Sequence, residues 1–340
     1  MNILFDLNHP VDVNFFKNTI LKLNSKGYDI IVVFRSRGKL KKILEYELGQ
    51  FKIVEVGKHD KSTFGKITGQ VKRDIDMFNL FKKEKIDLVV SFGGVSSVAA
   101  RFARIPYLDF DDDFEYKLTF YRGNIFSTRH IMPAFITFDN KKTYKYKGFK
   151  ELAYLHPKYF QFNKEEIEKN GLLPNEYIFI RLISSVSLNY KEEKNNFREV
   201  INEAAKIGLK IVVSLEDDEL KKQIQNDCIF LKEPVNDLYS IMKGAAFIIS
   251  SGDTMARESC LLSVPCIYIG GREMAVNDEL INMGAMFFET DVDSIVKRMK
   301  HITGSGIKEQ MDQKINDKIK NEWEDTTVVI LKHVNEFLKK

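Results

Sequence analysis

The sequence is poor in cysteine and has no long apolar run. Its three cysteines, Cys228, Cys260 and Cys266, stand in apolar contexts without metal-site spacing, so no disulfide framework is expected and a reducing compartment fits. No apolar run approaches the roughly 20 residues that cross a bilayer. The first residues, from Met1 to Asp6, lack a basic segment and are typical of a strand rather than a signal peptide. We therefore expect a cytoplasmic protein.

The signatures of several function classes are also missing. No Gly-x-Gly-x-x-Gly follows a strand candidate, so a dinucleotide is not supported and we expect no cofactor. No helix-turn-helix, zinc-finger or RNP pattern accompanies the basic residues, so nucleic acid is not an expected partner. The composition, 44% hydrophobic and 29% charged, is typical of a folded protein, and 340 residues are enough for two domains.

The net charge of +4 is unevenly distributed along the chain. Residues 1–160 carry 28 Lys and Arg against 18 Asp and Glu, a net of +10, whereas residues 161–340 carry 24 against 30, a net of −6. A basic first half suits an anionic partner, such as a membrane surface, a phospholipid-linked acceptor or an acidic glycan. The alternative is that Lys-rich helix faces, such as that of residues 82–85, only solvate the fold.

Apolar strand candidates alternate with amphipathic helices twice along the chain. This repeated alternation predicts an α/β fold with two Rossmann-like, parallel-sheet domains that face each other across a cleft. We expect an acceptor-side domain over 1–155, a nucleotide-sugar domain over 165–320, and a last helix over 321–340 that packs back on the first domain. The predicted strands are 2–6, 29–34, 52–56, 87–91, 106–109, 177–182, 209–214, 227–231, 246–250 and 266–269. The predicted helices are 12–25, 39–47, 65–84, 95–103, 193–206, 217–224, 236–243 and 254–262.

A small-residue turn joins the predicted strand 246–250 to a short helix. The turn, Ser251-Gly252-Asp253-Thr254, leaves backbone N–H groups at the positive end of the helix dipole, which suits a phosphate. Glu258 follows two helical turns after Ser251 on the same face, where a carboxylate can accept hydrogen bonds from sugar hydroxyls. The pattern indicates a nucleotide-sugar site. An ordinary N-cap turn with a solvated Glu258 remains the alternative.

The first strand ends in a second group of polar residues, Asp6-Leu7-Asn8-His9-Pro10. His9 stands at the carboxyl end of the strand, where ligands of doubly wound sheets bind, and its pKa range suits a general base that Asp6 can orient. In the alternative, Asp6 and Asn8 cap the following helix and Pro10 begins it.

Two further strand ends carry candidate ligand groups. Arg181 ends the strand 177–182, and its guanidinium suits a diphosphate leaving group, unless it pairs with a neighbouring acid. Gly93 and Gly94 follow the strand 87–91, and such a turn either holds an anion or is simply tight. The run from Asp111 to Asp113, after Asp109, invites a metal hypothesis, but we favour an acceptor contact or a solvated loop and expect no metal site.

Several segments resemble a known family, the domain of unknown function 354 family, a prokaryotic group with a glycosyltransferase-B-like fold. The matching segments, in order, are Asp6-x-x-His9-Pro10-x-x-Val13-x-Phe15-Phe16-Lys17, Gly57-Lys58-His59, Glu151-Leu152-Ala153-Tyr154-Leu155-His156-Pro157 and Ser251-Gly252 with Glu258. These segments are distributed over most of the chain, from Asp6 to Glu258. The resemblance implies a glycosyltransferase-B-like, two-domain fold.

The segment 250–265 also resembles the nucleotide-binding motif of the peptidoglycan N-acetylglucosaminyl transferase and of UDP-N-acetylglucosamine 2-epimerases. This resemblance implies that Ser251 and Gly252 contact phosphate and that Glu258 contacts ribose. Asp253 and Thr254 replace residues that differ among those families.

Together these observations predict a metal-independent glycosyltransferase of surface polysaccharide biosynthesis. It would move a sugar from a nucleotide-sugar donor to a glycan or lipid-linked acceptor, with His9 as base, and with Arg181 and the amides of 251–254 holding the diphosphate. The alternatives are a nucleotide-sugar 2-epimerase that uses Asp6 and Asp111 as acid and base, and a binding protein of the same fold without catalysis.

Overall fold

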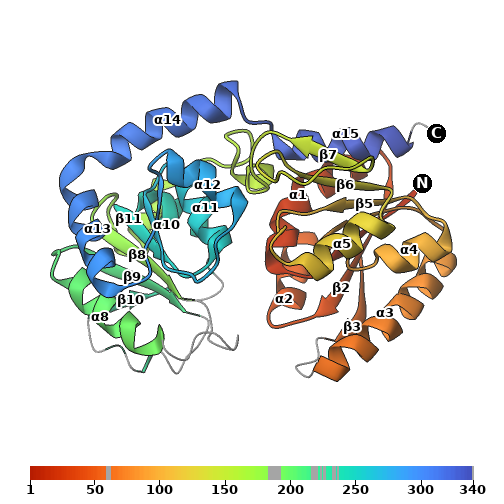
Figure 1. Cartoon of the computed structure of the whole chain (residues 1–340), viewed down its shortest axis with the longest axis horizontal. Helices are drawn as coiled ribbons and strands as arrows, with labels where there is room; N and C mark the ends of the chain where they lie inside the picture. The colour runs from red at the N-terminus through yellow and green to blue at the C-terminus, as the bar shows by residue number, and fades with distance from the viewer. Residues whose placement is uncertain are drawn as a thin grey trace. The chain divides into compact units, whose positions relative to one another are not determined.

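The computed structural model describes residues 1–58, 63–182, 193–215, 221–222, 224, 227–231, 235 and 237–338. The chain divides into two compact units, drawn with their elements in Figure 1. Unit 1 comprises Met1–Tyr159 and Trp323–Lys340, and unit 2 comprises Phe160–Glu322.

Unit 1 is built on a seven-stranded parallel sheet in the order β3-β2-β1-β4-β5-β6-β7. This order starts in the middle and winds outward in both directions, so the carboxyl ends of β1 and β4 meet where the winding reverses, the usual place for ligands in such sheets. The strands are β1 Asn2–Leu7, β2 Asp29–Ser36, β3 Lys52–Lys58, β4 Ile86–Phe92, β5 Tyr107–Phe110, β6 Arg129–Pro133 and β7 Thr143–Tyr146.

Helices cover both faces of this sheet, as crossover connections between parallel strands require (Figure 1). They are α1 Pro10–Asn24, α2 Leu40–Leu48, α3 Thr63–Lys83, α4 Ser97–Ala103, α5 Lys117–Phe126, α6 Leu152–Leu155 and, from the end of the chain, α15 Thr326–Leu338. Helix α15 packs against α1 and α6, and the hydroxyls of Thr326 and Thr327 donate to the carbonyls of Phe149 and Ala153, each over 2.8 Å.

Unit 2 repeats the plan with a six-stranded parallel sheet in the order β10-β9-β8-β11-β12-β13. The strands are β8 Tyr177–Leu182, β9 Lys210–Leu215, β10 Cys228–Phe230, β11 Phe247–Ser250, β12 Cys266–Tyr268 and β13 Met286–Phe288. The helices are α7 Lys164–Lys169, α8 Glu193–Ala205, α10 Leu238–Gly244, α11 Asp253–Leu261, α12 Ala275–Asn282, α13 Val292–Ser305 and α14 Ile307–Asn321.

The central strands form the core of each unit. Helices cover both faces of a parallel sheet, so the sequences of its central strands are continuous apolar runs. In unit 1, Leu4, Val33 and Val89 pack against Met77 and Phe81 of α3. The same packing occurs in unit 2 around a buried cluster of 15 residues that includes Ile178, Ile249 and Met299. The two predicted parallel-sheet α/β units are therefore confirmed.

Three strands of the structure are not among the predicted ones. β6 carries Arg129, His130 and Pro133 in five residues, and β7 at the sheet edge is half polar, so neither has an apolar run. β13 has only three residues. The predicted helix 217–224 lies mostly outside the described residues. Within the described part of the chain, no helix is both long and apolar enough to cross a membrane.

Candidate functional site

The turn between β11 and α11 lies at the carboxyl edge of the unit 2 sheet. Ser250 and Ser251 are buried, and the Ser250 hydroxyl donates to the Gly252 carbonyl over 2.9 Å and accepts from the Gly252 N–H over 3.1 Å. The Ser251 N–H donates to the carbonyl of Arg181 on the neighbouring strand over 3.0 Å. These bonds hold the turn rigidly against the sheet.

Helix α11 begins at this turn without a side-chain cap. Its N-cap residue is Gly252, in an extended conformation with φ −97° and ψ 125°, so the N-cap position provides no side-chain hydrogen bond to the first helical turn. The first N–H groups of a helix lack intrahelical acceptors and carry the positive end of the dipole. The start of α11 therefore has the geometry of an anion site.

A carboxylate and a buried guanidinium share the first turn of α11. Asp253 is the first helical residue and carries a negative charge that by itself disfavours a phosphate. Arg257, fully buried one turn later, approaches the Asp253 carboxylate to 3.4 Å and donates to the Asn277 side chain over 3.0 Å. Its second terminal nitrogen lies 3.4 Å from the Thr254 hydroxyl. Arg257 was not among the predicted site residues, and its positive charge offsets the charge of Asp253.

Arg181 lies next to the turn, as the fold requires. It pairs in register with Ser250 across β8 and β11, and its guanidinium donates to the Ser214 hydroxyl on β9 over 2.8 Å. Its side chain is half-buried. The structure thus brings the predicted leaving-group residue and the predicted phosphate turn to the same sheet edge.

A close backbone contact completes this edge at the end of β12. A Cβ added to Gly270 would lie 2.5 Å from the Ser251 carbonyl oxygen and 2.6 Å from the Tyr268 hydroxyl. Only glycine therefore fits at 270, and the segment after β12 supports the turn from the side. The next residue, Gly271, has open space around the same position.

Glu258, the predicted ribose ligand, is largely buried in the second turn of α11. Its side chain accepts a hydrogen bond from the Tyr239 hydroxyl of α10 over 3.0 Å, and residue 258 is 4% exposed. It is therefore not a solvated helix residue. Tyr239 carries no motif that could have predicted this contact.

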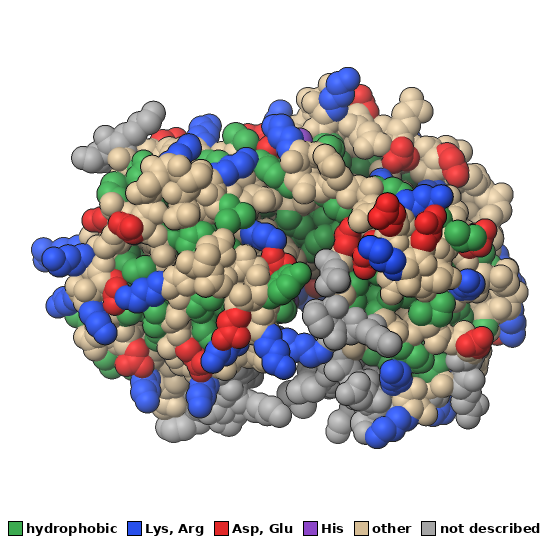
Figure 2. All heavy atoms as spheres, turned by 180° about the vertical axis from the view of Figure 1, so that it is seen from behind, with side chains coloured by type: hydrophobic (Ala, Val, Ile, Leu, Met, Phe, Trp, Pro, Cys, Tyr) green, Lys and Arg blue, Asp and Glu red, His purple; other side chains and the backbone are tan. Residues whose placement is uncertain are grey.

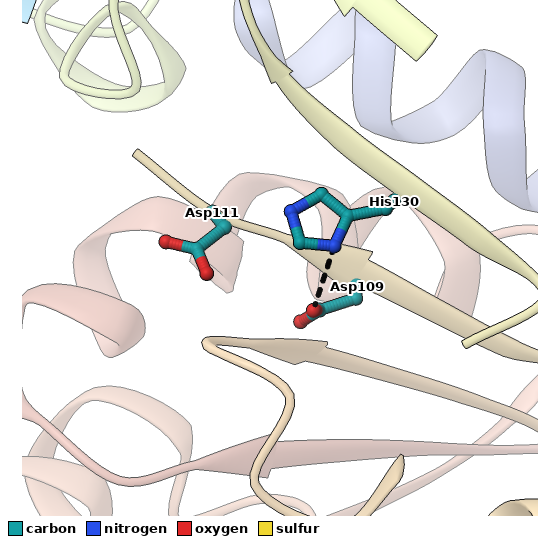
Figure 3. Close-up of side chains that lie close together, drawn as sticks. All are labelled: Asp109, Asp111 and His130. Atoms are coloured by element: carbon teal, nitrogen blue, oxygen red, sulfur yellow. Dashed lines mark ion pairs between the residues drawn. The ribbon is translucent and has the colours of Figure 1, made fainter. Parts of the chain in front are cut away.

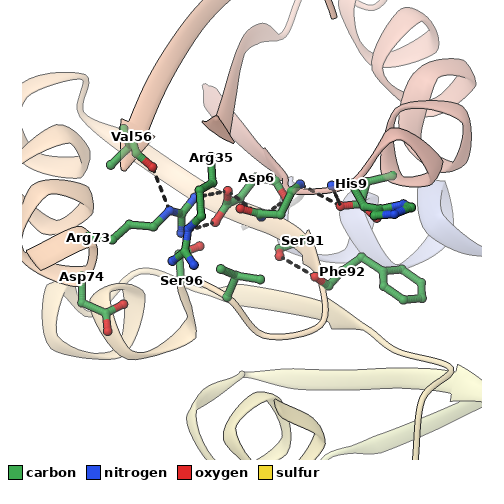
Figure 4. A network of polar contacts seen from close by, with 12 residues as sticks. Asp6, His9, Arg35, Val56, Arg73, Asp74, Ser91, Phe92 and Ser96 are labelled. Carbon is green, nitrogen blue, oxygen red and sulfur yellow. Dashed lines mark hydrogen bonds and ion pairs between the residues drawn. The ribbon is translucent and has the colours of Figure 1, made fainter. Parts of the chain in front are cut away.

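In unit 1, Asp6 forms a fully buried ion pair with Arg73 of α3 (Figure 4). The two terminal nitrogens of Arg73 lie 2.5 and 3.1 Å from the carboxylate oxygens, and its Nε donates to the Val56 carbonyl over 3.0 Å. The carboxylate of Asp6 thus anchors α3 to β1 and β3. Its suggested role in orienting His9 has no support in these contacts.

His9 is exposed and acts as the N-cap of α1. Its Nδ1 accepts from the Val11 N–H over 3.3 Å, and the Asp12 carboxylate accepts from the His9 N–H over 2.9 Å, which makes a reciprocal capping box. Burial raises the pKa of Asp12 to about 7. The structure thus assigns the cap to His9 rather than to Asp6 and Asn8, and it places the ring at the carboxyl end of β1.

The glycine turn after β4 binds the carboxyl group of Asp109 from the next strand. Gly93 and Gly94 have φ of +76° and +62°, and the Gly94 N–H donates to Asp109 Oδ1 over 2.7 Å. Asp109 lies next to Asp111 and His130, and all three are buried (Figure 3). His130 was not among the predicted site residues because it lies inside the unpredicted strand β6.

The remaining acidic residues of the run differ in their surroundings. Asp112 pairs with Lys150 over 2.9 Å, whereas Asp113 accepts from the Tyr116 N–H over 3.2 Å. His59 and most of the loop after Arg181 lie outside the described residues. On the face drawn in Figure 2, Lys and Arg side chains lie among Asp and Glu rather than in one continuous patch.

Comparison with known proteins adds the family. A family model described as "Protein of unknown function (DUF354)" matches residues 1–339. The chain belongs to the DUF354 family. Among curated proteins, this DUF354 chain is 22% identical to the uncharacterized protein MJ0665 of Methanocaldococcus jannaschii over 317 residues, 89% of this chain and 92% of that protein. The predicted family resemblance is confirmed.

Two solved structures show the fold. The UDP-GlcNAc 2-epimerase from Neisseria meningitidis bound to UDP-GlcNAc superposes with a TM-score of 0.76 at 15% identity, covering 99% of this chain and 100% of that one. The spinosyn forosaminyltransferase SpnP superposes with a TM-score of 0.71 at 13% identity, covering 100% of both chains. The DUF354 chain therefore has the fold shared by GT-B glycosyltransferases and UDP-GlcNAc 2-epimerases.

Proposed function

We propose that this protein is a glycosyltransferase that moves a sugar from a nucleotide-sugar to a glycan or lipid-linked acceptor in surface polysaccharide biosynthesis. The observation that carries the proposal is the start of α11, whose N-cap Gly252 has no side chain and which lies beside Arg181 at the sheet edge. The fold shared with nucleotide-sugar enzymes supports it.

The donor is assigned to unit 2. The segment of Ser251, Gly252, Asp253 and Thr254 binds the diphosphate. The Ser251 and Gly252 N–H groups already donate to the Arg181 carbonyl and the Ser250 hydroxyl, so the positive end of the α11 dipole, at Asp253 and Thr254, provides the attraction for the anion. Arg181 stabilises the charge that develops on the leaving diphosphate, so this site needs no metal. Glu258 accepts hydrogen bonds from the ribose hydroxyls.

His9 is the proposed general base. It takes the proton from the acceptor hydroxyl while the hydroxyl oxygen bonds to the anomeric carbon and the bond from that carbon to the diphosphate oxygen breaks. Its exposed ring and its position at the carboxyl end of β1 support this role. Asp6 is left out of the mechanism because Arg73 engages both of its oxygens.

The acceptor is assigned to unit 1 on the basis of charge. Residues 1–160 carry a net charge of +10, which suits an acidic glycan, a phospholipid-linked sugar or the anionic surface of a membrane. Peripheral contact with the inner face of the membrane would follow from a lipid-linked acceptor. Binding to anionic vesicles that falls with added salt would support this assignment.

A ligand screen tests the donor site. Thermal or chemical unfolding is measured with UDP-, GDP-, CMP- and dTDP-sugars, and a true donor at 100-fold its dissociation constant raises the free energy of unfolding by about 2.7 kcal/mol. Glu258→Gln keeps the shape and should weaken that donor selectively. A protein that no nucleotide or nucleotide-sugar stabilises would refute the assignment of unit 2.

A pair of His9 variants tests the base. His9→Asn keeps a good N-cap but removes the base, whereas His9→Ala removes both and should also lose about 1 kcal/mol of stability. Turnover should fall at least 100-fold in both variants with little change in donor affinity. Turnover retained in His9→Asn would show that His9 is only a cap.

A nucleotide-sugar 2-epimerase is the second candidate, favoured by the carboxyl of Asp111. Burial raises its pKa to about 7, a value that suits a group exchanging a proton at carbon. Incubation of UDP-GlcNAc in deuterated water without acceptor separates the two reactions. Deuterium at C2 supports the epimerase, and sugar transfer that needs an acceptor supports the transferase. Tight binding with neither reaction would leave a non-catalytic binding protein.

A further inference from the structure

The three buried side chains of Figure 3 come together through strand pairing. Asp109 of β5 and His130 of β6 are direct partners in the parallel register. Asp111 follows Asp109 by two residues, so the pleat directs both carboxylates to one face of the sheet. The ligand atoms of the three residues all lie within 4.8 Å of one another, and His130 Nδ1 lies 3.5 Å from Asp109 Oδ2.

Each carboxylate has one oxygen that is fixed and one that is not. Asp109 Oδ1 accepts from the Gly94 N–H over 2.7 Å, and Asp111 Oδ1 accepts from the Asp113 N–H over 2.9 Å. Oδ2 of both residues and Nδ1 of His130 have no hydrogen-bond partner among the described residues. Asp109 and His130 are fully buried and Asp111 is 3% exposed, and an unsatisfied buried polar atom is expensive. The arrangement therefore calls for a ligand between these atoms.

The charges indicate what kind of ligand fits. The imidazole of His130 offers a ring nitrogen as a further ligand atom. Two buried carboxylates this close repel each other unless a cation lies between them. Two carboxylate oxygens and one imidazole nitrogen are a donor set typical of divalent manganese, iron or zinc.

The backbone at Gly123 leaves room for the Asp109 carboxylate. A Cβ added to Gly123 of α5 would lie 1.9 Å from Asp109 Oδ2, so only glycine lets the carboxylate occupy its position. Metal–ligand distances of about 2.1 Å place opposite ligand atoms about 4.2 Å apart. Neighbouring ligand atoms of one ion lie about 3.0–3.4 Å apart, so the three atoms, all within 4.8 Å of one another, need to approach by about 1–2 Å to bind one ion.

We propose that Asp109, Asp111 and His130 bind one divalent transition-metal ion inside unit 1. The site is separate from the phosphate turn of unit 2, and it does not depend on the proposed transfer reaction. Asp109 and Asp111 would bind through Oδ2 and His130 through Nδ1, with the backbone amides of Gly94 and Asp113 orienting the two carboxylates from behind.

Metal titration of the full chain tests the proposal. The protein, without a polyhistidine tag and stripped with a chelator, is titrated with Mn²⁺, Co²⁺ and Zn²⁺ by calorimetry, and bound metal is counted after gel filtration. We expect one ion per chain and, with Co²⁺, the visible absorption of a site that includes a nitrogen ligand. Absence of stoichiometric binding by all three metals would overturn the proposal.

Matched variants locate the ion. Asp111→Asn keeps the shape and the contact to the Asp113 N–H, and it should weaken binding at least 100-fold, as should Asp109→Asn. Asp139→Asn changes an exposed carboxylate of unit 1 that is not a proposed ligand and should leave the metal affinity within about twofold of the wild type. Unchanged affinity in both ligand variants would refute the site. Far-ultraviolet circular dichroism of the chelated proteins confirms that each variant is folded.

Discussion

The two units have sheets that wind outward from the middle in the same way, but different residues lie at the carboxyl ends of their strands. In unit 2 the edge that carries Arg181 consists mainly of serines, glycines and the start of α11. In unit 1 the corresponding edge carries acids, of which Asp6 is neutralised by Arg73 and Asp109 lies beside His130. The unit 2 edge therefore combines small residues and the start of α11 with the buried Arg257 and Glu258, whereas the unit 1 edge consists mainly of buried ionisable side chains.

This difference shows how one architecture supports two kinds of recognition. Backbone amides and a helix dipole bind a phosphate with few demands on side-chain identity. Buried charges must be paired one by one, since each unpaired charge is costly. We therefore expect changes in unit 1 to affect stability most, and changes in unit 2 to affect ligand affinity most.

The largest effect is expected at the Asp6–Arg73 pair. Asp6→Asn or Arg73→Met removes one partner of a fully buried ion pair and should lower the free energy of unfolding by about 3–5 kcal/mol, measured by urea denaturation. Asp6→Leu combined with Arg73→Met removes both charges and should lose clearly less than the sum of the single changes. Additive losses would show that the two side chains do not act as a pair.

A smaller effect is expected at the end of β12 in unit 2. Gly270→Ala places a Cβ 2.5 Å from the Ser251 carbonyl oxygen, so the turn must shift, at a cost of about 1–3 kcal/mol. Affinity for the stabilising nucleotide, measured by calorimetry, should fall about tenfold or more. Gly271→Ala is the matched control, because nothing lies within 4 Å of its added atom. Equal nucleotide affinity in the two variants would contradict the conclusion that Gly270 supports the turn at Ser251.

The smallest effect is a pH dependence in unit 1. His333 of α15 is 7% exposed, and burial with the nearby Arg129 lowers its pKa to about 4. Between pH 6.5 and pH 4 the unfolded chain binds the extra proton on His333, so the contribution of His333 to the free energy of unfolding falls as the pH falls through this range. The full loss lies below pH 4, where both states are protonated.

A variant isolates this contribution. The neutral His333 ring, whose Nδ1 lies 3.1 Å from the Arg129 guanidinium, can accept its hydrogen bond. His333→Asn keeps a hydrogen-bond acceptor but does not titrate in this range. Between pH 6.5 and pH 4 its free energy of unfolding should therefore fall by about 1–3 kcal/mol less than that of the wild type. Parallel stability curves for the two proteins would contradict this assignment.

The sequence predicted the apolar parts of the molecule better than the polar ones. The strands around Leu4, Val89 and Ile249 are continuous apolar runs, so their presence and order could be read directly. β6 and β7 could not, because their polar residues find partners only in the folded sheet. The same reason explains why His130 was missed although Asp109 was noticed.

Site residues followed the same rule. The proximity of Arg181 and Ser251 could be predicted because both lie at the ends of apolar strands, which parallel pairing brings together. Arg73, Arg257 and Tyr239 were missed because their roles depend on contacts across 67, 20 and 19 positions, respectively, of the chain. No local pattern encodes such distances. Pairings of this kind become visible only when the helices are placed on the sheet.

The return of α15 to unit 1 has a consequence for synthesis on the ribosome. Unit 1 draws its last helix from Trp323–Lys340, whereas all of unit 2 emerges earlier, so unit 2 can finish folding while unit 1 still exposes the surfaces of α1 and α6 that α15 covers. Emergence of α15, rather than completion of the first sheet, is then the event that completes unit 1. A chain stopped before Thr326 would carry a complete unit 2 and a unit 1 that lacks its last helix.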